Sequence, residues 1–446
     1  MYNIRNVTKD VIWLGADDRR LALFENVFPL PKGVSYNSYL LADEKTVLFD
    51  TADAAISEKF FDNLSAALGG RPLDYIVINH MEPDHCALLA EVLQRYPHAT
   101  LVGNAKTFTL TSGFFDFKDA KTLTVKEGDS LCCGKHTLRF YLAPMVHWPE
   151  VMVTYDETDK ILFSADAFGS FHSLDGNLFN DEVNYDRDWL DEARRYYANI
   201  VGKYGVMVQN ALKKLSGLEL AYICPLHGLV WRSEFEYLLD KYDKWSRYEA
   251  ESDGVIVIYG SLYGHTENAA EILASLLSQA GVKDVRVYDA SKTHVSELIS
   301  EIFRVKNVVI ASATYNAEIY TPVKNLIADM KALAVQNKNF ALIENGSWAP
   351  AAKAQMTAEL STLKNCTFEE ISLTVRSALK ENQIGTLQAL AGSLADLLFG
   401  GLADVVMAIQ RLAHGSYRDP AGFCDVLDGC HEYHLPVMCL VWIALF

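Results

Sequence analysis

Hydrophobic and polar residues in the first half of the chain follow a pattern typical of strands separated by helices. Short runs rich in β-branched and aromatic residues end in polar or glycine-containing turns, as strands of a sheet do. We expect strands at residues 36–41, 46–51, 73–80, 100–104, 138–144, 152–157, 160–169 and 220–228. Residues 57–70 and 86–97 carry apolar side chains at the three- to four-residue spacing of amphipathic helices. This mixture predicts mixed sheets covered by helices.

The pattern changes at residues 249–254, where a polar, acidic stretch precedes a new apolar strand. Such a change in composition is typical of a domain boundary. Beyond it, strands expected at 255–259, 285–290, 307–313, 339–346 and 368–375 alternate with helices expected at 266–281, 296–303, 323–333, 352–363 and 377–398. Regular alternation of this kind predicts a doubly wound parallel sheet.

Length, charge and cysteine content narrow the classes of protein. A chain of 446 residues is long enough for two or three domains. The formal net charge of -17 disfavours nucleic acid as a partner, because a negative field repels phosphates. The start lacks the layout of a signal peptide and the most apolar run, 435–446, is too short to span a bilayer, so we expect a cytoplasmic protein without membrane contact. Its eight cysteines include no CxxC pair, which indicates reduced thiols and no fused rubredoxin or zinc ribbon.

The strongest chemical motif directly follows the expected strand at 73–80. His80, Glu82, Asp84 and His85 place four side chains of metal-ligand type within six residues. Loops at the carboxyl end of a strand can direct several such groups into one cavity. Burying so many ionisable groups without a metal would cost several kcal/mol or more for each unpaired charge. The motif therefore predicts a metal site.

Three more candidate ligands follow other expected strands: His147, Asp166 and His227. Alone, His147 or His227 would be read as a solvated or capped residue at a strand end. Together with the motif they supply four imidazoles and three carboxylates. That set is sufficient for two metal ions, each with two histidines, its own carboxylate and a share in one bridging carboxylate.

A second group of candidates lies in three loops that follow expected strands of the second half. A loop rich in hydroxyls that leads into a helix can bind a phosphate through backbone N–H groups, and aromatic residues nearby can stack on a flat ring. The GxxxxGK pattern of a Walker loop is absent. The candidate cofactor-binding residues are Ser261, Leu262, Tyr263, Gly264, His265, Thr266, Ala313, Thr314, Tyr315, Asn316, Ala317, Ser347 and Trp348.

The HxExDH motif, with the stretches HWPEVM, SADAFG and CPLHG, closely resembles the metallo-β-lactamase-like domain of flavodiiron proteins. In that family the HxHxDH zinc signature carries glutamate at its second ligand position, as Glu82 does here. The resemblance implies that His80, Glu82 and His147 hold one iron, that Asp84, His85 and His227 hold the other, and that Asp166 bridges them. A hard oxygen ligand also stabilises the oxidised state of a metal pair better than a neutral imidazole does. Tyr36, Trp148 and either Tyr196 or Tyr197 are candidates for residues around the ligands.

The three loops of the second half resemble a short-chain flavodoxin domain, the other half of the flavodiiron family. The resemblance implies an N-terminal metallo-β-lactamase-like αββα sandwich at 1–250, a flavodoxin-like doubly wound sheet that binds FMN at 254–398, and an extension of unknown role at 399–446. The family's usual Gly-Trp-Ser-Gly stretch reads Ser-Trp-Ala-Pro at 347–350, so the resemblance does not specify the ring contacts of that loop. Cys424, Cys430, His431 and His434 of the extension match no known metal-site spacing.

The function implied by the resemblance is the reduction of dioxygen to water or of nitric oxide to nitrous oxide. Four electrons are needed for dioxygen, and two ferrous ions with a fully reduced FMN hold four. A rubredoxin-like or other small donor and a head-to-tail homodimer are further expectations from the family. Two alternatives remain open: a zinc hydrolase with an accessory flavodoxin domain, for which Glu82 is the wrong residue, and an electron carrier whose metal is structural and fully coordinated.

Overall fold

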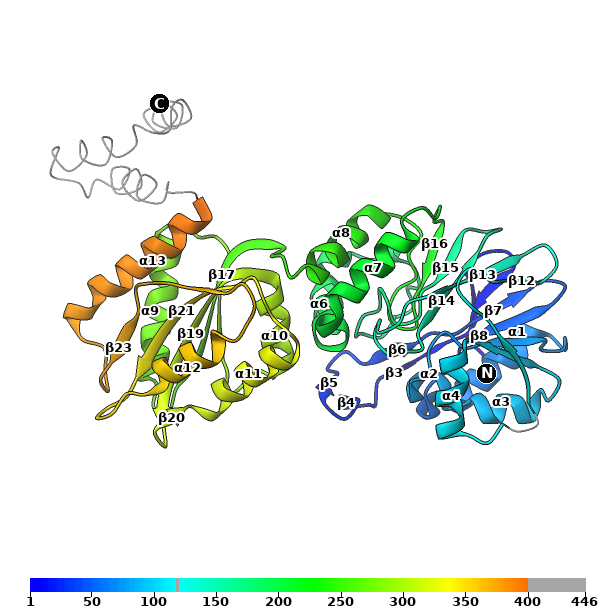
Figure 1. Cartoon of the computed structure of the whole chain (residues 1–446), viewed down its shortest axis with the longest axis horizontal. Helices are drawn as coiled ribbons and strands as arrows, with labels where there is room; N and C mark the ends of the chain where they lie inside the picture. Colours follow the sequence, from blue (N-terminus) through cyan, green and yellow to red (C-terminus); the bar gives the residue numbers. More distant parts are fainter. Residues whose placement is uncertain (118–119, 400–446) are drawn as a thin grey trace, which may run out of the picture. The chain divides into compact units, whose positions relative to one another are not determined.

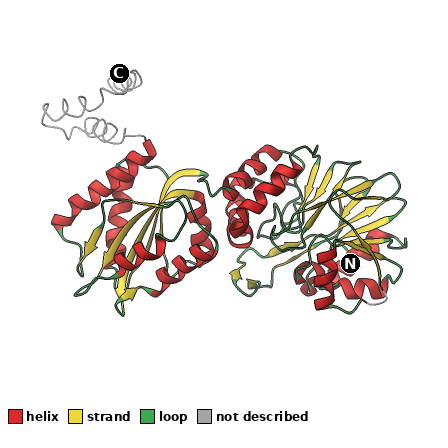
Figure 2. Ribbon diagram, viewed as in Figure 1, coloured by secondary structure: helices red, strands yellow, loops and turns green. Residues whose placement is uncertain are grey.

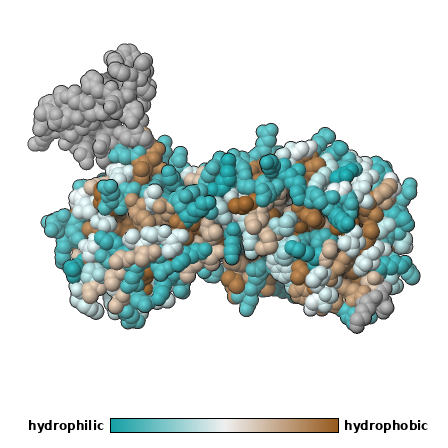
Figure 3. Space-filling model, viewed as in Figure 1, coloured by the Kyte–Doolittle hydropathy of each residue, from teal (hydrophilic) through white to brown (hydrophobic). Residues whose placement is uncertain are grey.

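The computed structural model describes residues 1–117 and 120–399. The chain divides into two compact units, Met1–Arg247 and a second that begins at Tyr248. Residues 400–446, with the cysteines and histidines of the expected extension, lie outside the described residues. On the face drawn in Figure 3, hydrophilic side chains are spread over both units. None of the helices within the described ranges is long and apolar enough to cross a membrane.

The first unit contains two sheets with helices on their outer faces (Figures 1 and 2). In spatial order the first sheet is β1 (Arg5–Asn6), β2 (Val11–Trp13), β7 (Tyr39–Ala42), β8 (Thr46–Phe49), β9 (Tyr75–Val77), β10 (Thr100–Gly103) and β11 (Lys121–Thr124). The second is β12 (Ser130–Cys132), β13 (Thr137–Leu142), β14 (Met152–Asp156), β15 (Ile161–Phe163) and β16 (Tyr222–Cys224). Two short ribbons pair β3 (Ala16–Asp18) with β6 (Val34–Tyr36), and β4 (Leu23–Phe24) with β5 (Phe28–Pro29).

The helices of this unit include several that the hydrophobic pattern did not reveal. They are α1 (Ser57–Leu68), α2 (Pro83–Cys86), α3 (Leu89–Arg95), α4 (Ala105–Phe114), α5 (Tyr185–Asp188), α6 (Leu190–Tyr196), α7 (Gly205–Leu215) and α8 (Phe235–Ser246). The helix expected at 86–97 is divided between α2 and α3. The break follows from Pro83, which starts a short helix six residues after β9, so that the chain must turn before α3 begins.

The two sheets pack face to face through the alternate residues of their strands. Phe49 of β8 and Phe163 of β15 stack with ring centroids 3.7 Å apart and nearly parallel planes. Val77, Phe140 and Met152 are fully buried in the same core. Because side chains of a strand alternate between its two faces, this leaves Val153 and Leu162 to face the helices that cover the second sheet.

Strand direction in the second sheet positions the loops that carry candidate ligands. β13 pairs antiparallel with β14, β14 antiparallel with β15, and β15 parallel with β16. The carboxyl ends of β13, β15 and β16 therefore lie at the same edge of the sheet. His147, Asp166 and His227 follow those three strands, so the topology brings their loops to one edge.

The second unit is a parallel sheet between two helical layers. Its strands are β18 (Val285–Asp289), β17 (Ser252–Gly260), β19 (Val305–Tyr315), β21 (Asn339–Asn345) and β22 (Thr367–Phe368), with β23 (Leu373–Val375) parallel to β21 and β20 (Glu318–Ile319) antiparallel to β19. Its helices are α9 (His265–Gln279), α10 (Val295–Arg304), α11 (Thr321–Ala332), α12 (Ala352–Leu360) and α13 (Ile384–Phe399). Helices α9 and α13 share one core with the sheet. The predicted fold class, an αββα sandwich followed by a doubly wound sheet, is confirmed.

Two expected elements of the second unit are wrong in detail. The single strand at 368–375 is two strands, β22 and β23, each paired with a different part of β21. The last helix begins at Ile384 and not at residue 377, because Ser377 has the left-handed φ of 65°, which no α-helix contains. The loop that results places Ser377 at the carboxyl edge of the sheet.

Lys338, the residue before β21, is buried in this unit. Its Nζ donates a hydrogen bond to the carbonyl oxygen of Val305 at 2.8 Å, and burial lowers its pKa to about 7. In the unfolded chain the lysine keeps its proton up to its ordinary pKa of 10.5. Between these two values the unfolded state binds more protons than the folded state, so the contribution of Lys338 to the free energy of unfolding rises with pH.

We therefore expect the free energy of unfolding of the wild type, measured against Lys338→Met, to rise with pH above about 7. The increase is up to about 1.4 kcal/mol for each pH unit, because one proton separates the two states. Urea unfolding of both proteins at several pH values between neutrality and about pH 10 measures it. A difference between the two proteins that stays constant over this range would contradict a depressed lysine pKa.

Candidate metal centre and flavin pocket

The loop that carries the HxExDH motif is held in place by a buried carboxylate. One oxygen of Asp50, just after β8, accepts hydrogen bonds from the backbone N–H groups of Asn79 at 2.8 Å and His80 at 3.1 Å. Burial raises the pKa of Asp50 to about 6, although these hydrogen bonds act to lower it. Glu82 then precedes α2, whose first turn presents Asp84 and His85. Asp50 was not among the residues expected from the sequence.

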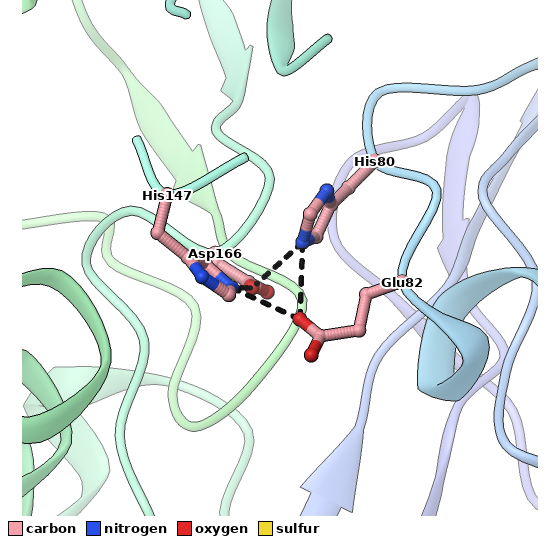
Figure 4. A group of neighbouring side chains, drawn as sticks. All are labelled: His80, Glu82, His147 and Asp166. Carbon is pink, nitrogen blue, oxygen red and sulfur yellow. Dashed lines mark hydrogen bonds and ion pairs between the residues drawn. The ribbon is translucent and has the colours of Figure 1, made fainter. Parts of the chain in front are cut away.

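Four candidate ligands from three loops converge on one point (Figure 4). The Nε2 atom of His147 lies 2.9 Å from Oε2 of Glu82 and 3.0 Å from Oδ2 of Asp166. Nε2 of His80 lies 3.2 Å from the same glutamate oxygen and 3.3 Å from the same aspartate oxygen. These four atoms lie within 4.8 Å of one another. Two ring nitrogens and two carboxylate oxygens thus enclose a space of the size that a metal ion occupies.

The other three candidates form a second group beside the first. Nε2 of His85 and Nε2 of His227 each lie 3.2 Å from Oδ2 of Asp84. The remaining oxygen of Asp166, Oδ1, lies 3.0 Å from Nε2 of His85 and 3.8 Å from Nε2 of His227. Asp166 therefore presents one oxygen to each group. This is the geometry of a carboxylate shared by two ions.

The second group leaves buried polar atoms without hydrogen-bond partners. Both carboxylate oxygens of Asp84, Oδ1 of Asp166, and Nε2 of both His85 and His227 are buried, and their close approaches lack hydrogen-bond geometry. Such atoms cost free energy unless another partner satisfies them. All of them belong to the cluster of candidate ligands, so the donor set fits a bound cation.

The charges within the cluster compensate one another when no metal is present. Burial opposes the charged form of each histidine, but nearby carboxylates raise the pKa of His85 and of His147 to about 9. The same pairing holds the pKa of Asp166 well below its usual value, although burial acts in the opposite direction. At neutral pH the metal-free site therefore contains protonated imidazoles paired with carboxylates. A metal ion would replace those protons.

The far sides of two ligand rings are also fixed. Nδ1 of His80 lies 2.8 Å from Oε1 of Glu150, which also accepts the backbone N–H of Met81 at 2.9 Å. Nδ1 of His227 lies 2.7 Å from the carbonyl oxygen of Ser35. Partners of this kind orient a ligating imidazole and set which nitrogen faces the metal. Glu150 lies three residues after His147, within HWPEVM, but neither it nor Ser35 was expected from the sequence.

The aromatic residues expected around the ligands divide into two sets. The rings of Tyr36 and Tyr196 have centroids 5.6 Å and 5.5 Å from that of His227, and Trp148 lies 5.4 Å from His80. Tyr197 packs instead on Tyr242 and Trp245. The Tyr196 hydroxyl is buried without a hydrogen-bond partner, and burial raises its pKa well above the ordinary value. It therefore keeps its proton beside the cluster.

A carboxylic acid outside the motif contacts the first ligand group. Glu25 lies in the turn between β4 and β5 and is hydrogen bonded to Glu82. Desolvation and the neighbouring Glu82 charge raise the pKa of Glu25 to about 8. Burial acts to raise the pKa of Glu82 as well, but His147 and His80 outweigh it and lower the pKa of Glu82. Nothing in the local sequence of the turn indicated this contact.

In the second unit, a cavity of about 440 Å³ opens where β17, β19 and β21 end. Its walls contain every residue of the predicted cofactor-binding set except Gly264. Gly264 instead precedes α9 with a φ of 85°, a conformation that favours glycine. Further lining residues are Asn345, Gly346, Ala349 and Ser377. Ser377 was missed because it lies in the loop before α13, where its carbonyl oxygen accepts a hydrogen bond from Nδ2 of Asn345, the last residue of β21, at 3.0 Å.

The chemistry of this cavity suits an anionic, aromatic ligand. The Ser261 hydroxyl accepts the backbone N–H of Gly264 at 3.1 Å, which shapes the loop before the first turn of α9. The lining residues include no lysine or arginine, so backbone N–H groups and hydroxyls would bind a phosphate there. Tyr315 is 44% exposed and Trp348 is 88% exposed, so each of the two side chains can stack on a flat ring. The residues present fit a flavin nucleotide.

Comparison with known proteins agrees with both sites. Residues 34–228 match the ODP family beta lactamase and residues 257–368 match the flavodoxin family. An anaerobic nitric oxide reductase flavorubredoxin of Aeromonas hydrophila is 32% identical over 361 residues, which cover 80% of this chain and 72% of that protein.

Solved structures resemble the chain over most of its length. Rubredoxin oxygen:oxidoreductase from Desulfovibrio gigas has a TM-score of 0.83 at 27% identity, covering 90% of this chain and all of that one. The flavodiiron protein of Giardia intestinalis has a TM-score of 0.84 at 25% identity, covering 90% and 97%. The chain combines a β-lactamase-like unit with a flavodoxin unit, and it covers more than two thirds of a relative with which it shares more than 30% identity. The chain therefore belongs to the flavodiiron protein family.

Proposed function

We propose that this protein is an oxidoreductase that reduces dioxygen to water, nitric oxide to nitrous oxide, or both, at two non-haem iron ions supplied with electrons through FMN. One observation carries the proposal: Asp166 presents one carboxylate oxygen to each of two clusters of histidine and carboxylate ligands. The names of relatives support both gases, because one is called a nitric oxide reductase and another an oxygen:oxidoreductase.

The ligands divide between the two ions as the two clusters do. His80, Glu82 and His147 would hold one iron, Asp84, His85 and His227 would hold the other, and Asp166 would be shared between them. Iron held there would supply the redox chemistry that reduces the gas, and a site for two ions suits one diatomic molecule. Glu82 favours this over a zinc hydrolase, because a hard anionic ligand stabilises the oxidised metal pair.

Residues around the ligands have supporting roles. Glu150 and the Ser35 carbonyl hold the His80 and His227 rings, so that Nε2 of each faces the metal. The buried Tyr196 hydroxyl has a free hydrogen-bonding position beside the cluster and can donate to a bound gas. Glu25 keeps a proton next to Glu82.

FMN occupies the cavity of the second unit in this proposal. The loop at 261–266 and the first turn of α9 bind its phosphate, while the loops at 313–317 and 347–348 border its ring. A flavin held there would supply electrons singly or in pairs. A rubredoxin-like or other small donor, a head-to-tail homodimer and a cytoplasmic location are further parts of the proposal that rest on family membership.

The proposal is tested by the composition and reactivity of the purified protein. Iron, zinc and FMN are measured per chain, and the reduced protein is then mixed anaerobically with dioxygen or with nitric oxide. We expect two irons and one FMN, and reoxidation by at least one gas. Zinc in place of iron, or no reoxidation by either gas, would eliminate the proposed function.

The bridging role of Asp166 gives a sharper prediction. Asp166→Asn removes the charge shared by both ions, so metal content and gas-dependent reoxidation should both fall, the latter by about a hundredfold or more. Asp156→Asn is the matched control, because Asp156 is equally buried and bonded to a histidine, His136, at 2.7 Å, outside the cluster. Retention of both irons by Asp166→Asn would refute the bridge.

Metal binding should release protons at neutral pH. His85 and His147 have pKa values of about 9 in the metal-free protein, and an imidazole must be neutral to ligate a metal. We expect uptake of ferrous iron at neutral pH to release about two protons or more per chain, and fewer above about pH 9. Anaerobic calorimetry in two buffers of different ionisation enthalpy counts them. Equal heats in both buffers would show that the ligands are already deprotonated.

Trp348 tests the flavin pocket. If its exposed ring stacks on the isoalloxazine, Trp348→Ala should weaken FMN binding by about 0.5–1.5 kcal/mol, which is roughly two- to tenfold in Kd. Trp348→Phe keeps an aromatic face and should bind FMN nearly as the wild type does. Titration of the flavin-free protein with FMN, followed by flavin fluorescence, gives both constants. An unchanged Kd for the alanine variant would remove Trp348 from the ring contacts.

A further inference from the structure

A small cavity of about 30 Å³ lies in the first unit between α7 and the outer face of the second sheet. Its wall includes Val153 of β14 and Leu162 of β15 on one side, and Val208, Ala211 and Leu212 of α7 on the other. The surface that it presents to its interior is entirely apolar. It is separate from the polar cluster of candidate ligands.

The two hydroxyl groups in the wall are already bonded elsewhere. The Ser164 hydroxyl donates to the carbonyl oxygen of Ala167 at 2.8 Å. The Tyr242 hydroxyl accepts the backbone N–H of Phe168 at 2.6 Å. A buried water needs two to four polar partners, and apolar cavities that lack them stay dry and take up apolar molecules such as xenon. This cavity is large enough for a single small molecule and offers water nothing to bind.

The cavity adjoins the chain segments that carry two of the ligands. Val146, in its wall, directly precedes His147, and Ala167, also in its wall, directly follows Asp166. On the opposite side, Ala211 and Leu212 of α7 are only partly buried, so the outer wall is near the protein surface. The wall of the cavity thus includes the chain neighbours of two ligands as well as residues of α7 that solvent partly reaches.

We propose that this cavity binds an apolar diatomic gas and delivers it to the metal centre from the side of α7. Dioxygen and nitric oxide are uncharged and weakly solvated, so a dry apolar cavity favours them over water and ions. Water and charged reductants are disfavoured in this cavity because its two hydroxyl groups are already bonded elsewhere and the rest of its wall is apolar. The identity of the gas rests on the proposed function, whereas the cavity and its apolar wall do not.

Xenon, an apolar probe of similar size, tests the binding site without any metal or activity. Crystals of the metal-free full-length protein are exposed to xenon under pressure, and the anomalous signal of the gas is mapped. We expect a xenon atom between Val153, Leu162 and Val208. A map with no xenon in this position, or with an ordered water there, would overturn the proposal.

Two variants fill the cavity to different extents. Ala211→Val adds two methyl groups to its wall, and Val208→Ile adds one, so that one conservative variant remains should the larger one disturb folding. Asn210→Val is the matched control, because it places the same β-branched residue in the same turn of α7 on the exposed face. Circular dichroism and melting temperature verify that each variant is folded.

In the iron- and FMN-loaded protein, the filled variants should lose xenon binding and react more slowly with limiting gas. The second-order rate constant for reoxidation should fall by about tenfold in Ala211→Val and by less in Val208→Ile, while the rate at saturating gas stays as in the wild type. Asn210→Val should match the wild type in both measurements. A variant that loses xenon but keeps its second-order rate constant would disprove the delivery role.

The outcomes separate this inference from the proposed function. Should the wild type react with neither gas, the proposed function fails, and the xenon map still decides whether the apolar site exists. Should the wild type react with a gas while its crystals show no xenon in the cavity, the proposed function stands and the inference fails.

Discussion

The carboxylate of Asp166 is the group on which the architecture of the first unit depends. Its two oxygens face different pairs of imidazoles, His80 with His147 and His85 with His227, at 3.0 to 3.8 Å. A single negative charge cannot balance the protonated imidazoles of His80, His85 and His147 in a buried site. Glu82 and Asp84 therefore supply further negative charge on either side of Asp166. The neighbouring imidazoles in turn lower the pKa values of Glu82 and Asp166. This cluster of donor atoms is therefore suited to bind two metal ions in place of the protons.

Strand direction explains why residues far apart in sequence can meet at Asp166. β13, β15 and β16 run in one direction, so the loops after them share an edge, while the loop after β9 arrives from the other sheet. The position of that loop depends on Asp50, which accepts hydrogen bonds from the backbone at Asn79 and His80. The core contact between Phe49 and Phe163 sets the distance between the two sheets. The metal cluster is thus a product of sheet packing as much as of the motif.

The sequence predicted the parts of the site that local patterns encode. The HxExDH motif, the residues after three strands and the loops of the flavodoxin unit could all be recognised because a strand followed by polar ligand-type residues is a local feature. Long-range partners could not. Glu150 reaches His80 across 70 residues, the Ser35 carbonyl reaches His227 across 192, and Glu25 contacts Glu82 from an unremarkable turn. Ser377 was assigned to a helix because neighbouring residues favour one, whereas its left-handed φ is imposed by tertiary contacts at the edge of the pocket.

The first unit combines this charged cluster with an apolar cavity whose wall contains the chain neighbours of two ligands, and the two features support one another. Val146 and Ala167 directly flank the ligands His147 and Asp166 in the chain and contribute to the apolar wall of the cavity. Low polarity strengthens the attraction between a carboxylate and a cation and raises the cost of leaving either unpaired. The same low polarity favours the binding of an uncharged diatomic molecule. An enzyme that must bind highly charged ions tightly and still admit an apolar gas gains from both properties, and here the same loops that carry His147 and Asp166 also contribute aliphatic side chains to the cavity wall.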